Sequence, residues 1–193
     1  MEKDKVNKAC RVLIVGGSAG SLDALLKIFP NLDNNSFAIV IVLHRKNAED
    51  TTLEELIAVK SHIPVMEVED KTALLPGYIY IAPSDYHLLF EKSELLSLDA
   101  SEKINYSRPS IDVAFESAAE VYGPSLTGIL LSGANADGTV GIKAINEQGG
   151  LTIVQDPNTA DVPFMPNHAI QHANPDFIFN IEEMLNFISK INK

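Results

Sequence analysis

Short apolar runs alternate with segments of helical periodicity along most of this chain. Apolar residues from Leu22 to Phe29 follow the i, i+3, i+4, i+7 spacing of one helix face, and similar stripes run through residues 111–122 and 141–147. This alternation predicts an α/β fold, in which a doubly wound, mostly parallel sheet carries helices on both faces. The strands are expected at residues 12–15, 37–43, 63–68, 126–131, 151–154 and 177–180.

Residues 76–98 break the alternation. The runs at 78–81, 87–90 and 94–98 look like short strands separated by turns, with no helical segment between them. We expect a small antiparallel hairpin excursion within the same domain. The length of 193 residues and a hydrophobic content of 46% suit one domain, expected from residue 11 to residue 193 behind an N-terminal tail of residues 1–10.

Charge and composition exclude several classes of function. With 15 basic and 26 acidic residues the formal net charge is −11, and no basic cluster stands out, so nucleic acid is not an expected partner. No apolar run approaches the roughly 20 residues that span a bilayer, so neither a signal peptide nor membrane insertion is expected. The single cysteine, Cys10, fits a reducing compartment, and we expect a cytoplasmic protein.

The first predicted strand ends in a turn that suits a nucleophilic serine. Gly16, Ser18 and Gly20 form a Gly-x-Ser-x-Gly pattern between the apolar run and the first helical segment. A serine hydroxyl becomes an effective nucleophile on such a turn, where backbone N–H groups lie close enough to receive an oxyanion. Turns of small residues after a first strand also occur without any chemistry, so this pattern alone leaves both interpretations open.

A histidine and an aspartate occupy comparable positions after two other predicted strands. His44 directly follows the apolar run 37–43, and Asp137 lies in a loop of small residues between a strand and a helix. Functional crevices of open α/β sheets lie beyond the carboxyl ends of the strands, so Ser18, His44 and Asp137 are candidates for a catalytic triad. Taken singly, His44 is also compatible with a surface loop, and Asp137 with a cap on the helix after Gly138.

Several motifs together resemble the catalytic domain of the chemotaxis protein-glutamate methylesterases, the CheB type. They are Gly16-Gly-Ser-Ala-Gly20, the strand ending in His44, and the segments at 75–83, 107–115, 131–138 and 165–170, in the family's order. The resemblance implies that Ser18 is the nucleophile, His44 the general base and Asp137 the carboxylate that orients the imidazole. It also implies hydrolysis of glutamyl methyl esters on chemoreceptor helices, with release of methanol, and deamidation of receptor glutamines as a second activity.

This chemistry requires oxyanion donors but no cofactor and no metal. The backbone N–H of Ala19, the residue after the serine, is the first candidate, and the loop around Ala134 offers a second. The histidines show no ligand spacing apart from His168 and His172, which stand at i, i+4 and are interpreted as surface residues of a late helix.

The sequence departs from the family pattern near the expected site. Ala19 stands where threonine is usual, Arg45 and Lys46 replace a small apolar residue and proline, and the loop at 134–136 reads Ala-Asn-Ala. These changes bear on substrate fit without removing a triad member. Relatives usually carry a receiver domain before the esterase domain, and only the tail of ten residues precedes the expected domain here, so no phosphorylation switch is expected within this chain.

Two other classes of function remain alternatives. An ordinary α/β-hydrolase would use Ser18, Asp137 and His168 in that chain order, although that fold places several strands before the nucleophile. A non-catalytic phosphate- or nucleotide-binding module would use the turn from Gly16 to Gly20 at a helix N-terminus. The turn lacks the G-x-G-x-x-G pattern and a P-loop lysine, and His44 stands where a ribose-binding acid would be expected.

Overall fold

A seven-stranded sheet, with strand order β10-β9-β8-β1-β2-β5-β3, forms the centre of the protein, and every neighbouring pair in it is parallel. The structure is a computed structural model that describes residues 9–32, 36–45 and 52–192. The strands are β1 (Val12–Gly17), β2 (Ala38–Leu43), β3 (Val65–Glu67), β5 (Ile79–Ile81), β8 (Leu126–Leu130), β9 (Leu151–Gln155) and β10 (Phe177–Phe179).

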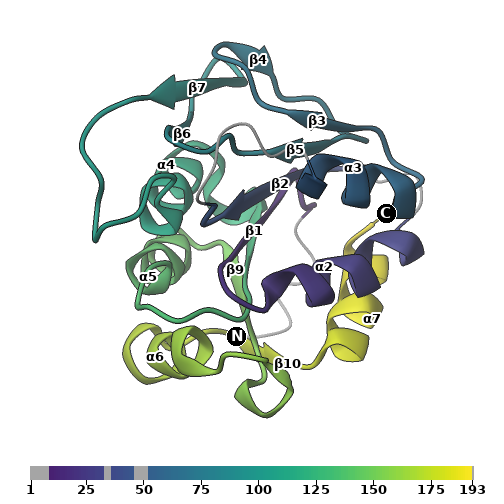
Figure 1. The fold of residues 1–193 in the computed structure, drawn as a ribbon, viewed down its shortest axis with the longest axis vertical. Helices are drawn as coiled ribbons and strands as arrows, with labels where there is room; N and C mark the ends of the chain where they lie inside the picture. Colours follow the sequence, from purple (N-terminus) through teal and green to yellow (C-terminus); the bar gives the residue numbers. More distant parts are fainter. Residues whose placement is uncertain (1–8, 33–35, 46–51, 193) are drawn as a thin grey trace.

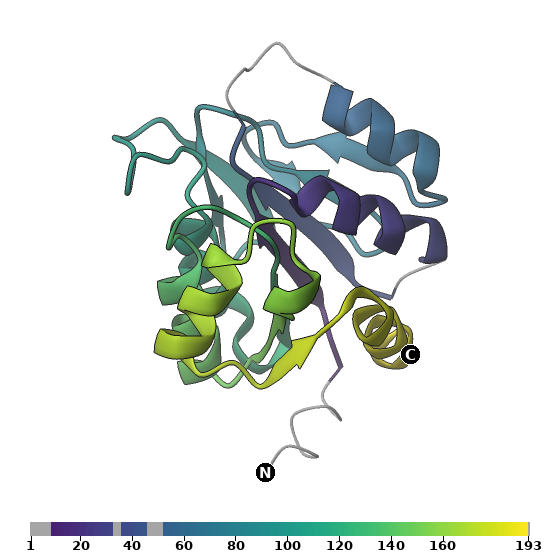
Figure 2. The same ribbon diagram turned by 60° about the horizontal axis from the view of Figure 1, so that its bottom comes forward.

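Helices cover both faces of this sheet. Figure 1 shows α4, α5 and α6 on one side of the sheet and α2, α3 and α7 on the other, and Figure 2 gives a second view of the same layers. The α-helices are α2 (Ser21–Ile28), α3 (Thr52–Lys60), α4 (Ile111–Tyr122), α5 (Thr139–Glu147), α6 (Phe164–Ala173) and α7 (Ile181–Ile191), with 3₁₀ turns η1 (Phe29–Asn31), η2 (Gly123–Ser125) and η3 (Pro157–Thr159). Among the described residues, no helix is both long and apolar enough to span a membrane.

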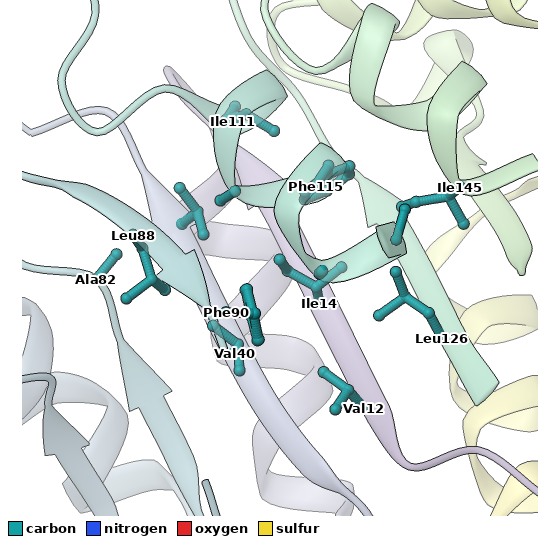
Figure 3. Packing of buried hydrophobic residues seen from close by; sticks show 14 of the residues in the cluster. Val12, Ile14, Val40, Ala82, Leu88, Phe90, Ile111, Phe115, Leu126 and Ile145 are labelled. Atoms are coloured by element: carbon teal, nitrogen blue, oxygen red, sulfur yellow. The ribbon is translucent and has the colours of Figure 1, made fainter. Parts of the chain in front are cut away.

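The side chains of β1 alternate between two buried clusters, one on each face of the sheet. Val12 and Ile14 pack with Phe115 of α4 on one face, whereas Leu13 and Val15 belong to the cluster beneath α2 and α7. Figure 3 shows the first cluster, in which residues from the sheet and from α4 and α5 interdigitate. A strand buried on both faces reads as a continuous apolar run, which is why β1 and β2 were recognisable in the sequence.

The strand order reverses beside β1. The chain runs from β1 to its neighbour β2 and later returns to the other side of β1 through β8. The register pairs Gly17 of β1 with Leu43 of β2, and Gly16 with Leu130 of β8, so the three strands end at nearly the same level. The loops that follow these strands therefore leave the sheet side by side, at the switch point where open α/β sheets place their functional crevice.

The predicted fold class is confirmed, with one strand misplaced. The runs at 87–90 and 94–98 form β6 (His87–Phe90) and β7 (Leu95–Asp99) of a small antiparallel sheet, which β4 (Thr72–Ala73) completes in the order β4-β7-β6. The run at 78–81 was also expected in this excursion, but as β5 it lies in the main sheet between β2 and β3. All three residues of β5 are buried, which fits a parallel strand covered on both faces.

Candidate active site

Ser18 lies on the sharp turn between β1 and α2. Its backbone N–H donates to the carbonyl of Ser132 at 2.9 Å, and its own carbonyl accepts the N–H of Ser21 at 3.1 Å and the Ser21 hydroxyl at 2.6 Å. Gly20 closes the turn with φ of +80°, and a Cβ there would stand 2.6 Å from the Cβ of Asp161. The turn therefore requires glycine at position 20, and it holds Ser18 half-buried at the carboxyl edge of the sheet.

His44 follows β2, as the sequence predicted, and its ring contacts the loop after β8. The Nε2 atom lies 2.7 Å from Oδ2 of Asp137, and Nδ1 lies 3.5 Å from the amide nitrogen of Asn135. Because an amide nitrogen only donates, Nδ1 is the accepting nitrogen and Nε2 carries the proton that is donated to Asp137. The imidazole is thus held with its accepting lone pair on Nδ1, the arrangement that a general base needs.

Asp137 is buried and surrounded by hydrogen-bond donors. Besides His44, its carboxylate accepts the Ser110 hydroxyl at 3.0 Å and the backbone N–H groups of Ile111, Asp112 and Gly138 at 2.7, 2.9 and 3.1 Å. Burial alone would raise the pKa of Asp137, but the hydrogen bonds from His44 and from this backbone outweigh it and hold the pKa below its usual value. Asp137 is therefore ionised and can stabilise a positive charge on His44.

Asp137 does not cap the helix after Gly138, the alternative that the sequence left open, but binds the start of α4 instead. The helix after Gly138 has no side-chain cap, whereas Asp137 accepts the first N–H groups of α4, where orphan donors and the helix dipole favour an anion. Ser110 is the N-cap residue of α4, and its hydroxyl accepts the N–H of Val113 at 3.4 Å. One carboxylate thus binds both the histidine and the start of α4.

Asp112 places a second carboxyl group directly behind Asp137. Its Oδ1 accepts the N–H of Gly141 in α5 at 2.8 Å, and only 6% of the residue is exposed. Burial, together with the nearby negative charge of Asp137, raises the pKa of Asp112 to about 7. Asp112 has no distinguishing signal in the sequence, because the feature that sets it apart is a contact with a loop 25 residues away.

Ser18 and His44 open into the same surface cleft, which has a volume of about 630 Å³. Ala19 and Arg45 line it next to them, and the remaining lining residues come from two loops: Asp85, Lys103, Tyr106, Ser107 and Arg108. Asp137 does not line the cleft and reaches it only through His44. A reacting group in the cleft would therefore meet the serine and the histidine, with the aspartate screened from solvent.

The two oxyanion candidates differ in their surroundings. Ala19 lines the cleft, and its N–H makes no hydrogen bond to another residue in the described part of the chain. Ala134 is exposed and is not among the residues that line the cleft. Ala19 is thus the better placed of the two predicted donors.

The positive charge introduced after His44 is largely neutralised. Arg45 forms ion pairs with Glu54 and with Glu67, the latter at 2.8 Å, and it donates to the carbonyl of Ala82 at 3.0 Å. Its guanidinium is therefore held by these neighbours at the edge of the cleft. Lys46, the other expected departure, lies outside the described residues.

His168 does not take part in this arrangement. It lies on α6, where Nδ1 is 2.8 Å from the Thr139 hydroxyl, and its ring stacks between Phe164 and His172. Burial, with a smaller contribution from His172, lowers its pKa. Among the described residues, no group of three or more His, Cys, Asp or Glu side chains is arranged to hold a metal ion.

Comparisons with known proteins concern the family and the fold of the chain. The CheB methylesterase family model matches residues 13–188. The structure is similar to the crystal structure of the Thermotoga maritima CheB methylesterase catalytic domain, with a TM-score of 0.88 and a sequence identity of 31%. The match covers 94% of this chain and 99% of that one.

Longer relatives match over part of their length. The chain is 34% identical to the protein-glutamate methylesterase/protein-glutamine glutaminase of Thermotoga maritima over 87% of its own length, but it spans only 50% of that relative. A Leptospira interrogans protein to which the same name is given provisionally is 39% identical over 94% of both chains.

Proposed function

Because this chain belongs to the CheB methylesterase family, we propose that it is a serine hydrolase that removes methyl esters from glutamate side chains of chemoreceptor proteins. The observation that carries the proposal is the pairing of buried Asp137 with His44 in the cleft that Ser18 lines. Family membership supplies the substrate class, and the geometry supplies residues suited to ester hydrolysis.

In the proposed mechanism Ser18 is the nucleophile. Its Oγ attacks the ester carbonyl while its proton passes to Nδ1 of His44, and ionised Asp137 stabilises the resulting imidazolium through Nε2. The N–H of Ala19 donates to the oxyanion, with Ala134 as a second candidate donor. Collapse of the tetrahedral intermediate breaks the bond to the methoxy oxygen, which takes the proton from Nδ1 and leaves as methanol.

A second half-reaction regenerates the enzyme. His44 takes a proton from water, the hydroxide adds to the glutamyl ester of Ser18, and Ser18 leaves with the proton returned by the imidazole. The products are a free glutamate side chain and the original serine. Attack on a glutamine amide by the same steps would release ammonia, which is the proposed glutaminase activity.

The arrangement of an ordinary α/β-hydrolase receives no support at His168. That histidine contacts Thr139. Among the histidines in the described part of the chain, the one that contacts the side chain of Asp137 is His44. A non-catalytic phosphate-binding module also fits less well, because the turn at Ser18 shares its cleft with an imidazole that Asp137 orients.

The test is methanol release from a methylated chemoreceptor, with wild-type protein beside the Ser18→Ala variant. Wild-type release that Ser18→Ala abolishes supports the proposal. A serine-directed fluorophosphonate probe gives an independent reading, since an activated Ser18 is labelled and a binding module is not. Labelling without methanol release would keep the hydrolase but reject this substrate, and failure of both would reject the hydrolase.

A further inference from the structure

A tight hairpin at residues 102–107, which we name the cleft hairpin, projects beside the proposed catalytic serine. Ile104 and Ser107 exchange two backbone hydrogen bonds, at 3.2 and 2.9 Å, so Asn105 and Tyr106 form the two-residue turn between them. Both have positive φ, 48° for Asn105 and 64° for Tyr106. Figures 1 and 2 show the teal loop that contains this hairpin, between β7 and α4, extending away from the body of the protein.

Tyr106 has an unusual combination of features. Asparagine is common at positive φ in such turns, but an aromatic residue is strained there. Tyr106 is nevertheless 97% exposed, so packing within the protein does not explain the large side chain. It also lines the cleft that contains Ser18 and His44. An aromatic ring that stands exposed at the mouth of such a cleft gains contacts when a polypeptide occupies it.

The base of the cleft hairpin is anchored to the rest of the site. Arg108 donates to the carbonyls of Ala100 and Ser101 at 2.9 and 2.8 Å. Buried His87 accepts the N–H of Ser110 at Nδ1, 3.2 Å away, and its Nε2 donates to the carbonyl of Glu102 at 3.0 Å. Ser110 in turn donates to Asp137. The hairpin is therefore held in a defined position relative to the catalytic residues, which lowers the entropy cost of binding through it.

The charges around the cleft single out Lys103. Arg45 is paired with two glutamates, and Arg108 donates to backbone carbonyls with Asp85 at 3.8 Å. Lys103, which lines the cleft and is exposed, makes no hydrogen bond or ion pair with another residue of the described chain. In a chain of net charge −11, an uncompensated ammonium at the cleft favours an anionic group on the substrate.

We propose that the cleft hairpin is the element that recognises the substrate polypeptide: Tyr106 packs on the chain that carries the esterified glutamate, and Lys103 pairs with a carboxylate side chain near the ester. The proposal rests on the methylesterase function proposed above and adds a substrate preference, namely glutamyl esters within acidic protein segments. Tyr106 and Lys103 bind and position the substrate and take no part in the covalent steps.

The experiment compares two substrates, a methylated chemoreceptor and the small ester p-nitrophenyl acetate, which carries no polypeptide and no carboxylate side chain for the hairpin to bind. The readout is the kcat/KM for the receptor divided by the kcat/KM for the small ester. Tyr106→Asn keeps a residue that tolerates positive φ but removes the ring, and it should lower this ratio about tenfold through a higher KM for the receptor. Tyr106→Phe retains the ring and should keep the ratio within about twofold of wild type.

Lys103→Gln tests the charge separately. It should raise the receptor KM about two- to fivefold at low salt and weaken the salt dependence of that KM, whereas the matched control Lys92→Gln, outside the cleft, should do neither. An unchanged ratio in Tyr106→Asn, or equal salt dependence in Lys103→Gln and wild type, would overturn the assigned role. If wild-type protein releases no methanol from the receptor, the methylesterase function itself fails, which is a different outcome.

Discussion

Replacement of Asp112 by asparagine should stabilise the protein at alkaline pH. Asp112 lies in the first turn of α4, where its Oδ1 accepts the Gly141 N–H at 2.8 Å and its own N–H binds the carboxylate of Asp137. Burial and the charge of Asp137 raise its pKa from 3.8 to about 7. Asparagine has the same shape, retains the acceptor for Gly141 and cannot ionise.

The sign and the size of the effect follow from proton linkage. Between pH 4 and pH 7 the folded protein keeps the Asp112 proton that the unfolded chain has already lost, so the free energy of unfolding falls as pH rises through this window. A shift of about 3 units, at about 1.4 kcal/mol each, makes the total loss about 4 kcal/mol. About 2–3 kcal/mol of this loss in the free energy of unfolding should occur between pH 5 and pH 8.

The measurement is urea unfolding of wild type and Asp112→Asn at pH 5 and pH 8. We subtract the free energy of unfolding of wild type from that of the variant. This difference should be about 2–3 kcal/mol larger at pH 8 than at pH 5. Because other titrating groups are present in both proteins, their contributions cancel in this comparison. A difference that is independent of pH would refute the raised pKa, and a difference that moves in favour of wild type between pH 5 and pH 8 would show that ionised Asp112 stabilises the fold.

The remaining predictions concern activity. Ser18→Ala should have the same free energy of unfolding as wild type, but its ester turnover should fall by about 10⁴-fold. Substantial turnover in the folded variant would reject Ser18 as nucleophile. His44→Ala should lose nearly as much in the same assay, and His168→Ala should stay within about twofold; the reverse result would favour the α/β-hydrolase arrangement. Asn135→Gly should raise kcat about two- to fivefold, because it frees Nδ1 of His44, whereas a lower kcat would mean that the amide supports the ring.

The parts of the fold that follow from local pattern were predictable. Runs buried on both faces, such as residues 37–43, identify central parallel strands, and the rule for switch points places Ser18, His44 and Asp137 on one edge of the sheet. The strand at 78–81 was misassigned because its sequence neighbours are antiparallel strands, whereas its pairing partners are β2 and β3. Pairing partners far apart in sequence leave no periodic signal.

The same limit applies to the surroundings of the triad candidates. Asn135 was noted only as a departure from the family pattern, and its contact with His44 depends on how the loop after β8 folds back. Arg45 was expected to add charge beside the ester pocket, but Glu54 and Glu67 neutralise it. In each case the residue type was visible in the sequence, and its partner, brought near by the fold, was not.

The position of Asp137 ties the stability of α4 to the orientation of His44. Gly16 of β1 contributes to this link, since a Cβ there would stand 2.5 Å from Ile111, and its absence lets the start of α4 approach the sheet. The first N–H groups of α4 then bind the carboxylate whose Oδ2 also receives the Nε2 proton of His44. These donors favour the ionised form of Asp137 even when His44 is neutral, so the carboxylate is charged before the imidazole receives a proton. Packing between α4 and β1 therefore prepares the charge that the proposed mechanism uses.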